Sequence, residues 1–303
     1  MAKLFEGIYP PLITSFTEEG DVYEKGIRNV INYLMSEGVH GFFINGSYGS
    51  AALMTTEERK RVAEIIHQEV KGRLPIITHV GKASTRATIE LARHAEGIGS
   101  AAVAAVMPYY YSGANAYDDD QLIRHYADIA ASVGVPTFMY NNPRTSGYNL
   151  TPELLAKLVK VGVLGMKDSS GSFTLLGEFN QAATQVNPAF DCMSGSVGLL
   201  QPAYNIGIKG CIAGTANAFP ELAVALYAAL EARDWEKANR LQNTVIAERK
   251  VQKAGGFRPA GCYTFLRMKG IDCGTVRRTW REPNEQETRS MKEEAVKLGL
   301  LGR

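Results

Sequence analysis

Residues 137–167 read TFMYNNPRTSGYNLTPELLAKLVKVGVLGMK, and this stretch decides the fold. Its two ends, Thr137–Tyr140 and Val163–Lys167, are short apolar runs without polar alternation, which predicts strands covered on both faces. Between them, Pro152–Lys160 has the apolar spacing of a helix. The stretch is therefore a strand–helix–strand unit, the building block of a parallel sheet.

The same alternation continues in both directions along the chain. Further strands are predicted at Gly7–Thr14, Gly41–Asn45, Pro75–Val80, Ala101–Met107, Phe190–Ser194 and Lys209–Ala213. Further helices are predicted at Tyr23–Glu37, from Thr56 onward, and at Ser84–Ile98, Asp119–Ser132, Phe173–Gln185, Val197–Asn205 and Pro220–Arg233. Strand–helix units repeated eight times with short connections predict the α/β class and a (β/α)8 TIM barrel over residues 1–233.

An open doubly wound sheet fits less well. Such a sheet has fewer units and carries a Gly-x-Gly-x-x-Gly turn after its first strand, whereas here residues 14–20 read TSFTEEG. Residues 234–303 contain two more helical patterns, Trp235–Val251 and Glu285–Leu298, around a Gly/Pro-containing segment at Gly255–Gly261. We expect them to form a C-terminal helical appendage packed on the barrel.

Composition narrows the functional classes. The 303 residues carry 33 Lys and Arg against 31 Asp and Glu, and this balance gives no reason to expect nucleic acid or a membrane surface as a partner. The 4 cysteines form no C-x-x-C pair, which favours a reducing, cytoplasmic location over a disulfide scaffold or a zinc site. The chain shows no apolar run of membrane-spanning length, no metal-binding histidine motif and no nucleotide fingerprint, so neither a metal nor a cofactor is expected.

The most informative residue is Lys167, which ends an otherwise apolar strand. Chemistry in a barrel sits at the C-terminal ends of the strands, and a buried ammonium is costly unless it is paired or deprotonated. A desolvated lysine has a lowered pKa and can attack a carbonyl as a neutral amine. The alternative is a lysine that caps the strand and faces solvent.

Imine formation on a 2-keto acid also needs a general acid/base and an anion site. Tyr140, which ends the preceding strand, is the candidate acid/base; alternatively it packs on the rim. The small-residue loop Gly46–Gly49 is the candidate anion site because its glycines let backbone N–H groups approach a carboxylate; a plain tight turn is the other interpretation. The tyrosines at 109–111 indicate either an interface cluster or a phenol that relays protons.

With these residues in place, the whole chain resembles the dihydrodipicolinate synthase/N-acetylneuraminate lyase superfamily of Schiff-base aldolases. The motifs GIYPPLITSF, NGSYGS, MPYYY, YNNP, GMKDSSG, SGS and GCIAGTANAFPE follow one another in that family's order and spacing. The resemblance implies a (β/α)8 barrel with C-terminal helices, a homotetramer built as a dimer of dimers, and a lysine imine with pyruvate or a related 2-keto acid.

The resemblance also implies roles for individual residues. Lys167 matches the Schiff-base lysine and Tyr140 the proton-shuttling tyrosine. Ser47 matches the hydroxyl residue that links Tyr140 to Tyr110, and Tyr110 the tyrosine that a neighbouring subunit contributes. The remaining implied substrate-binding residues are Gly46, Tyr48, Gly49, Gly195, Ile212, Arg144 and Thr145, with Gly195 as a pocket glycine and Ile212 as a residue whose carbonyl faces the keto acid.

The sequence departs from the family pattern at several of these positions. Tyr48 stands where the family has a small hydroxyl ligand for the carboxylate, and Ser50 where it has Glu. Thr145 stands where the synthases have Arg, with Arg144 one place early. The sialic acid lyases have an Asp-Glu pair where this chain reads Ser-Val-Gly at 196–198. The chemistry of the imine is therefore expected to be retained while the pocket for the second reactant differs and is less polar.

Several functions remain open on these grounds. The leading hypothesis is a lyase or aldolase that cleaves or forms a carbon–carbon bond through a lysine imine. A dehydratase or deaminase of a 2-keto-3-deoxy sugar acid or cyclic imino acid would use the same imine, and dihydrodipicolinate synthase is disfavoured by Thr145. An isomerase or phosphate-binding barrel, and a catalytically silent paralogue that acts as a binder, are alternatives of a different class.

Overall fold

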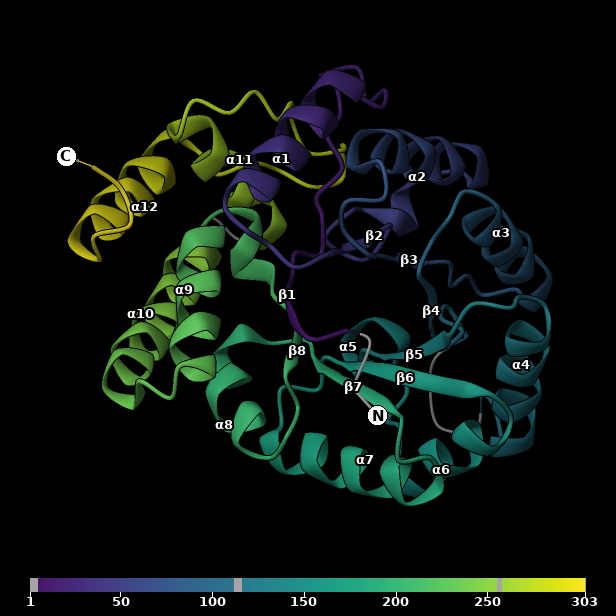
Figure 1. Ribbon diagram of the computed structural model, residues 1–303. Helices are drawn as coiled ribbons and strands as arrows, with labels where there is room; N and C mark the ends of the chain where they lie inside the picture. Colours follow the sequence, from purple (N-terminus) through teal and green to yellow (C-terminus); the bar gives the residue numbers. More distant parts are fainter. Residues whose placement is uncertain (1–4, 112–115, 255–257, 303) are drawn as a thin grey trace. The chain divides into compact units, whose positions relative to one another are not determined.

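The computed structural model describes residues 5–111, 116–254 and 258–302 (Figure 1). It confirms a (β/α)8 barrel with a C-terminal helical part: eight parallel strands form one sheet in the order β1-β8-β7-β6-β5-β4-β3-β2. The strands are β1 (Gly7–Tyr9), β2 (Phe42–Ile44), β3 (Ile76–His79), β4 (Ala102–Val106), β5 (Thr137–Asn141), β6 (Val163–Asp168), β7 (Asp191–Ser194) and β8 (Gly210–Ile212).

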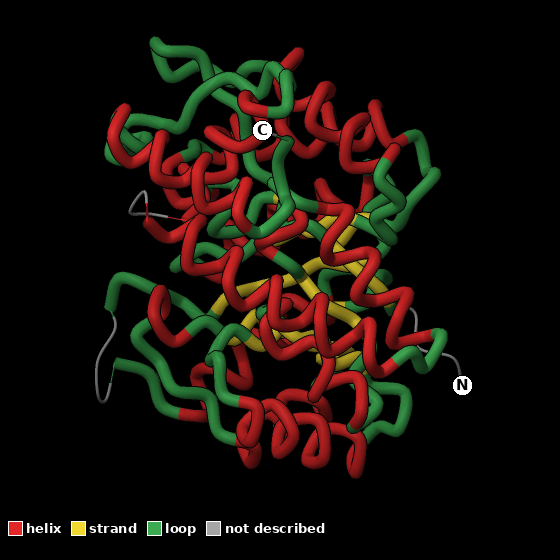
Figure 2. The backbone as a smooth tube through the Cα atoms, turned by 90° about the vertical axis from the view of Figure 1, so that its left-hand side faces the viewer, coloured by secondary structure: helices red, strands yellow, loops and turns green. Residues whose placement is uncertain are grey.

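Most of the helices are much longer than the strands they connect (Figure 2). The α-helices are α1 (Glu24–Ser36), α2 (Thr56–Val70), α3 (Thr85–Gly97), α4 (Asp119–Ala131), α5 (Pro143–Ser146), α6 (Pro152–Lys160), α7 (Phe173–Val186), α8 (Leu200–Asn205), α9 (Pro220–Glu231), α10 (Trp235–Ala254), α11 (Arg258–Met268) and α12 (Glu285–Lys297). Short 3-10 turns are η1 (Ala51–Leu53), η2 (Val197–Leu199) and η3 (Gly214–Asn217). Within the described ranges, the helices are all too short or too polar to cross a membrane.

The predicted first strand was too long. β1 ends at Tyr9, not at Thr14, because Pro10 and Pro11 have no N–H group to donate to a neighbouring strand. The chain nevertheless continues beside β2: the Phe43 N–H donates to the Pro10 carbonyl at 3.0 Å. The other predicted strands differ from the observed ones by one or two residues in total at their ends.

No helix was predicted over the Gly/Pro-containing segment Gly255–Gly261, yet part of it is helical. Residues 255–257 lie outside the described part of the chain, but α11 begins at Arg258 and runs through Gly261. Pro259 falls in the first turn of α11, where a missing N–H costs nothing. A Cβ on Gly261 would lie 2.8 Å from the Gln252 carbonyl oxygen of α10, so this glycine marks a close helix–helix approach and not a break.

The chain divides into two compact units, one comprising Met1–Gly7 with Leu74–Ile212 and the other Ile8–Arg73 with Ala213–Arg303. The first contains the parallel strands β3 to β8. In it, side chains that point outward from the strands pack against the covering helices in one apolar cluster, which includes Ala105, Met139, Val163, Met166 and Cys192. Neighbouring residues on a strand point to opposite faces. Because Met139 and Met166 point toward the helices, Tyr140 and Lys167 point to the opposite face of the sheet, away from them.

A bulge in β6 sets this arrangement. Val163 pairs with Thr137, but the next residue of β5, Phe138, pairs with Gly165, which leaves Leu164 without a partner in the ladder. Leu164 is accordingly 40% exposed although both of its neighbours are buried. The extra residue lets Val163 and Met166 share the outer apolar layer despite their odd spacing in sequence.

In the second unit, α10 packs against α9, α11 and α12. The connection that follows α11 is fastened to α2 by the Arg277 guanidinium, which contacts both carboxylate oxygens of Glu58 at 2.8 and 2.5 Å. This ion pair lowers the pKa of Glu58. The domain boundary at residue 233 stays a prediction.

Candidate active site

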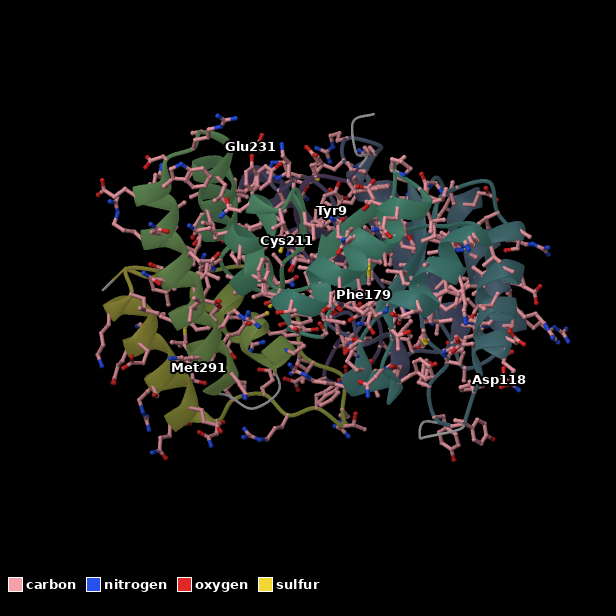
Figure 3. All side chains as sticks on the ribbon, turned by 90° about the horizontal axis from the view of Figure 1, so that it is seen from below. Tyr9, Asp118, Phe179, Cys211, Glu231 and Met291 are labelled. Atoms are coloured by element: carbon pink, nitrogen blue, oxygen red, sulfur yellow. The ribbon has the colours of Figure 1, made fainter. Side chains whose placement is uncertain are left out.

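Lys167 lies at the C-terminal end of β6 and is 4% exposed. Desolvation lowers the pKa of its ammonium group, while Tyr140 and Cys211 favour the charged form. Cys211, labelled in Figure 3, lies on β8. A lowered pKa increases the fraction of a lysine that is neutral at a given pH, and a neutral amine is a nucleophile toward carbonyl carbon.

Tyr140 is the register partner of Lys167 in the β5–β6 pair, and the two side chains touch. The Lys167 Nζ lies 4.2 Å from the centroid of the Tyr140 ring, and the two side chains share a hydrogen bond. The Asn142 amide donates to the Tyr140 Oη at 3.0 Å. His79 packs edge-to-face on the same ring, with its Nε2 accepting the Val106 N–H at 3.3 Å. Tyr140 is thus held from three sides.

Asp168 follows Lys167 and is also buried. Its carboxylate accepts the Asn141 amide at 2.7 Å, and the Ser170 N–H and hydroxyl at 3.1 and 2.7 Å. Desolvation raises the pKa of Asp168, and these hydrogen bonds oppose the shift. Gly195 lies beside it: its N–H donates to the Asp168 carbonyl at 2.6 Å, and a Cβ at Gly195 would collide with Ser169.

The other candidates in this unit are placed differently. Ile212 ends β8 and is 1% exposed. Arg144 and Thr145 lie on the short helix α5, and both are exposed. Tyr110 is 81% exposed, has a backbone φ of 85°, and packs edge-to-face against Tyr111. The β5–β6 ends therefore bring Lys167 and Tyr140 together, while Tyr110 is presented at the surface of this chain.

The Gly46–Gly49 loop belongs to the second unit and follows β2. Its glycines have steric reasons beyond access to an anion: a Cβ on Gly46 would lie 2.7 Å from the Phe43 ring, and one on Gly49 would lie 3.0 Å from the Leu12 carbonyl. The Gly49 carbonyl accepts the Thr14 hydroxyl at 2.8 Å. The loop is therefore a tightly packed turn, and both glycines are needed for the turn itself.

Ser47 and Tyr48 are half-buried at the tip of this loop. The Tyr48 ring lies directly against Gly214, the first residue of η3: a Cβ at Gly214 would be 2.5 Å from the Tyr48 hydroxyl oxygen and 2.7 Å from its Cζ. The turn that carries Gly214 is anchored, because the next residue, Thr215, donates its hydroxyl to the buried Glu248 carboxylate at 2.7 Å. The Tyr48 ring therefore fits here because Gly214 has no side chain.

Sequence reasoning missed several residues around these groups. Asn142 and Asp168 stand inside motifs that drew attention, YNNP and GMKDSSG, and a polar residue beside a strand-terminal lysine is a usable signal. The contact of Tyr48 with Gly214 and the hydrogen bond of Thr215 with Glu248 join residues far apart in sequence, so no local pattern reveals them.

Groups of three or more His, Cys, Asp or Glu side chains that could hold a metal ion do not occur in the described residues. The Lys167 amine has a phenol and a thiol beside it, and the phenol of Tyr140 in turn contacts an amide and an imidazole. This set suits covalent chemistry on a carbonyl, in which the amine attacks and the phenol moves protons.

Known proteins show the same architecture along the entire chain. Among curated relatives, the 4-hydroxy-tetrahydrodipicolinate synthase of Methanopyrus kandleri is 32% identical over 99% of both chains. A probable 2-dehydro-3-deoxy-D-pentonate aldolase of Escherichia coli is 33% identical over 80% of both chains. Among solved structures, YagE of E. coli K12 in complex with pyruvate matches with a TM-score of 0.93 and 28% identity, covering 98% of this chain and all of that one.

These similarities agree with a family model. The model of the dihydrodipicolinate synthetase family matches residues 4–298, a span that includes both compact units, Lys167 and the Gly46–Gly49 loop. The barrel, the buried lysine at the end of β6 and this match lead to one conclusion: the chain belongs to the dihydrodipicolinate synthetase family of lyases and aldolases.

Proposed function

We propose that the protein is a Schiff-base lyase or aldolase that acts on pyruvate or a related 2-keto acid, with Lys167 as nucleophile and Tyr140 as general acid/base. One observation carries the proposal: the Lys167 amine is buried, its pKa is lowered by desolvation, and it contacts the phenol of Tyr140. Such a pair supplies both the nucleophile and the proton carrier that imine formation requires.

The chemistry divides into balanced steps. The neutral Lys167 amine attacks the keto carbon, a C–N bond forms as the carbonyl π bond breaks, and Tyr140 gives its phenol proton to the carbonyl oxygen. The Tyr140 phenolate then takes the extra proton from nitrogen, which yields the carbinolamine. The phenol formed in this way gives a proton to the hydroxyl group, which leaves as water when the protonated imine forms. In cleavage, the hydroxyl on C4 loses its proton and becomes the aldehyde carbonyl as the C3–C4 bond breaks, the imine takes the electron pair to become an enamine, and C3 then takes up a proton; condensation is the reverse. Water finally releases the product and regenerates the amine.

We assign the carboxylate of the keto acid to the loop that carries Gly46, Ser47 and Gly49, and Ser47 as the hydroxyl that passes protons to Tyr140. The motif order supports this assignment, as does the tight packing of the turn that presents Ser47. Gly195 and Ile212 are proposed as contacts of the keto acid on the basis of the same motif order. Tyr48 is proposed to contact the second reactant.

Pyruvate is the favoured keto acid, and an aldehyde the favoured second reactant. The YagE structure holds pyruvate, and the E. coli relative at 33% identity is named as an aldolase of a 2-keto-3-deoxy sugar acid. The synthase reaction is less favoured because Thr145, at the position of the synthase arginine, is an exposed threonine whose hydroxyl donates to the Asn142 carbonyl at 3.2 Å.

We also propose a homotetramer built as a dimer of dimers. Tyr110 and Tyr111 are 81% and 68% exposed and pack on one another, and exposed aromatic pairs are typical of interfaces. Light scattering at micromolar concentration tests this assembly. A monomer would also remove the reason to assign Tyr110 to a site shared with a neighbouring subunit.

The decisive experiment is reduction with borohydride in the presence of pyruvate, followed by peptide mapping. The expected result is one reduced pyruvate adduct per chain, on Lys167. An adduct on another lysine would overturn the assignment of Lys167, and the absence of any adduct would favour a silent paralogue. A retro-aldol screen of 2-keto-3-deoxy sugar acids, read out as pyruvate release, then identifies the second reactant.

A further inference from the structure

Asn142 occupies a position at which its side chain would ordinarily cap a helix, yet it does not do so. It is the N-cap residue of α5, and asparagine is among the best N-cap residues because its side chain accepts a backbone N–H of the first turn. Here α5 has no side-chain cap hydrogen bond, and the amide donates instead to the Tyr140 Oη at 3.0 Å. The side chain thus binds Tyr140 and does not cap the helix.

The backbone of Asn142 keeps this amide in place. Its carbonyl oxygen accepts the N–H groups of Thr145 and Ser146, both at 3.0 Å, and the Ser146 hydroxyl at 3.1 Å. Asn142 is 9% exposed, so water competes poorly for the amide. Because the turn fixes the backbone and burial shields the side chain, the donor is held in position before substrate arrives.

The direction of this hydrogen bond determines where the phenol proton points. A phenol oxygen that accepts from the Asn142 amide uses a lone pair on that side, which leaves its own proton for another partner. The Lys167 amine shares a hydrogen bond with this phenol. The resulting order, from Asn142 to Tyr140 to Lys167, presents the phenol proton to a neutral amine.

We propose that Asn142 is a positioning residue for imine formation: its amide orients the Tyr140 hydroxyl toward Lys167 and stabilises the phenolate that forms while the proton is in transit. The inference rests on the proposed imine chemistry. During imine formation, Tyr140 gives its proton to the substrate oxygen and then takes one from nitrogen. The phenolate that exists between these transfers gains a hydrogen bond to the amide, and hydrogen bonds to charged groups are the stronger ones.

Other groups also face this hydroxyl or its partner, and they determine what a pH profile measures. Lys167 faces Tyr140 from β6, and Cys211 faces Lys167 from β8. His79 faces the Tyr140 ring from β3, and its Nε2 accepts a backbone N–H, as a neutral imidazole does. The acid limb of the profile is therefore expected to report the Lys167 amine and the alkaline limb the Tyr140 hydroxyl.

Two substitutions at Asn142 test the proposal. Asn142→Leu removes the donor at similar size, and Asn142→Asp keeps the shape but can only accept a hydrogen bond when ionised, which pulls the phenol proton away from Lys167. Asn142→Asp also retains a good N-cap side chain and serves as the second variant where Asn142→Leu does not fold. Asn149→Leu, an exposed asparagine in the same connection, is the matched control.

The readout is the rate of borohydride-trappable imine formation with pyruvate across pH. Asn142→Leu is expected to slow this rate by about tenfold, in keeping with one lost hydrogen bond to a charged intermediate, and to move the alkaline limb to higher pH because the phenolate is no longer stabilised. Asn142→Asp is expected to be slower still. The final amount of trapped Lys167 should remain that of the unmodified protein, as should the rate for Asn149→Leu.

Distinct results separate the possible failures. An unchanged rate and an unchanged alkaline limb in Asn142→Leu would overturn the positioning role. A rate in Asn142→Asp equal to that of the unmodified protein would show that residue 142 accepts from Tyr140, and would overturn the direction of the relay. If the unmodified protein itself traps no pyruvate, the proposed function fails, and this inference fails with it.

Discussion

At the ends of β5 and β6, polar groups are matched by partners within the same unit: Tyr140 by Lys167 and Asn142, and Asp168 by Ser170. In the loops after β2 and β8, the fit of Tyr48 against Gly214 is one of size, a large ring placed where its neighbour has no side chain. We therefore expect the first region to tolerate few changes of chemical identity, and the second to tolerate changes that preserve volume. On the proposed function, imine chemistry depends on the first region and substrate preference on the second.

The largest expected effect follows loss of the amine. Lys167→Ala should abolish turnover and borohydride trapping with pyruvate, because Lys167 supplies the amine that contacts Tyr140. The fold should persist, since the change removes a desolvated ammonium and not a core apolar group. Mass spectrometry and circular dichroism measure the two outcomes. Lys160→Ala, at an exposed lysine that ends α6, is the control and should trap normally.

The next effect in size comes from the phenol. Tyr140→Phe keeps the ring against His79 and removes only the hydroxyl, so packing is preserved while proton transfer is lost. We expect turnover to fall by roughly 10²–10⁴, the usual contribution of a positioned acid/base. Steady-state kinetics with the substrate found in the retro-aldol screen provides the measurement. A rate near that of the unmodified protein would mean that the proton takes another path.

Changes in the second region should alter selectivity more than imine formation. Tyr48→Thr should leave the rate of pyruvate imine formation intact and widen the range of accepted aldehydes. Gly214→Ala should displace the phenol, since the next residue, Thr215, is anchored to Glu248 and the added Cβ would lie 2.5 Å from the Tyr48 hydroxyl oxygen. Gly214→Ala should therefore shift the aldehyde preference when Tyr48 is present, and should change it little when it is combined with Tyr48→Thr.

A double-mutant cycle quantifies this coupling. Residues in contact show interaction energies of about 0.5–3 kcal/mol, and we expect a value in that range for kcat/KM with the bulkiest accepted aldehyde. Gly97→Ala is the matched control, because an added Cβ there meets nothing within 4 Å. Additive effects would show that Tyr48 and Gly214 act independently. Loss of pyruvate binding in Tyr48→Thr would instead identify Tyr48 as the carboxylate ligand.

The smallest effect concerns the hydrogen bond that the Asp168 carboxylate accepts from Ser170. Ser170→Ala removes a hydroxyl that favours the ionised carboxylate, so it should lower the free energy of unfolding by about 1 kcal/mol at neutral pH and by less in acid, where the carboxyl is protonated. Burial raises the pKa of Asp168 above its value in the unfolded chain. The contribution of Asp168 to the free energy of unfolding is therefore fully present below the pKa of the unfolded state and is lost as the pH rises through the pKa of the folded state. Thermal unfolding of both proteins at several pH values measures the difference; an equal loss at every pH would contradict it.

Much of the fold could be predicted because its signals are local. Apolar runs and helical spacing revealed the barrel, and Lys167 stood out because it ends such a run. Pro10 was wrongly placed inside a strand, and Gly261 was wrongly left outside a helix. In both cases the neighbouring backbone, which no local pattern shows, decides whether the residue ends an element or lies within one. Asn142 was visible in the sequence, but its role depends on whether its amide caps α5 or turns toward Tyr140, which requires three-dimensional information.

The unpaired Leu164 has a consequence for how this sequence tolerates insertions and deletions. In an uninterrupted strand, Val163 and Lys167 would point to the same face, so a lysine would enter the apolar layer beneath the helices whenever Val163 did. The additional residue reverses that phase partway along β6. Deletion of Leu164 would leave Val163 and Lys167 three positions apart, so a regular strand would still place the valine in the outer layer and the amine in the interior. At the present length of β6 the bulge keeps the amine in the interior, and we expect the strand to tolerate loss of Leu164 better than an insertion beside it.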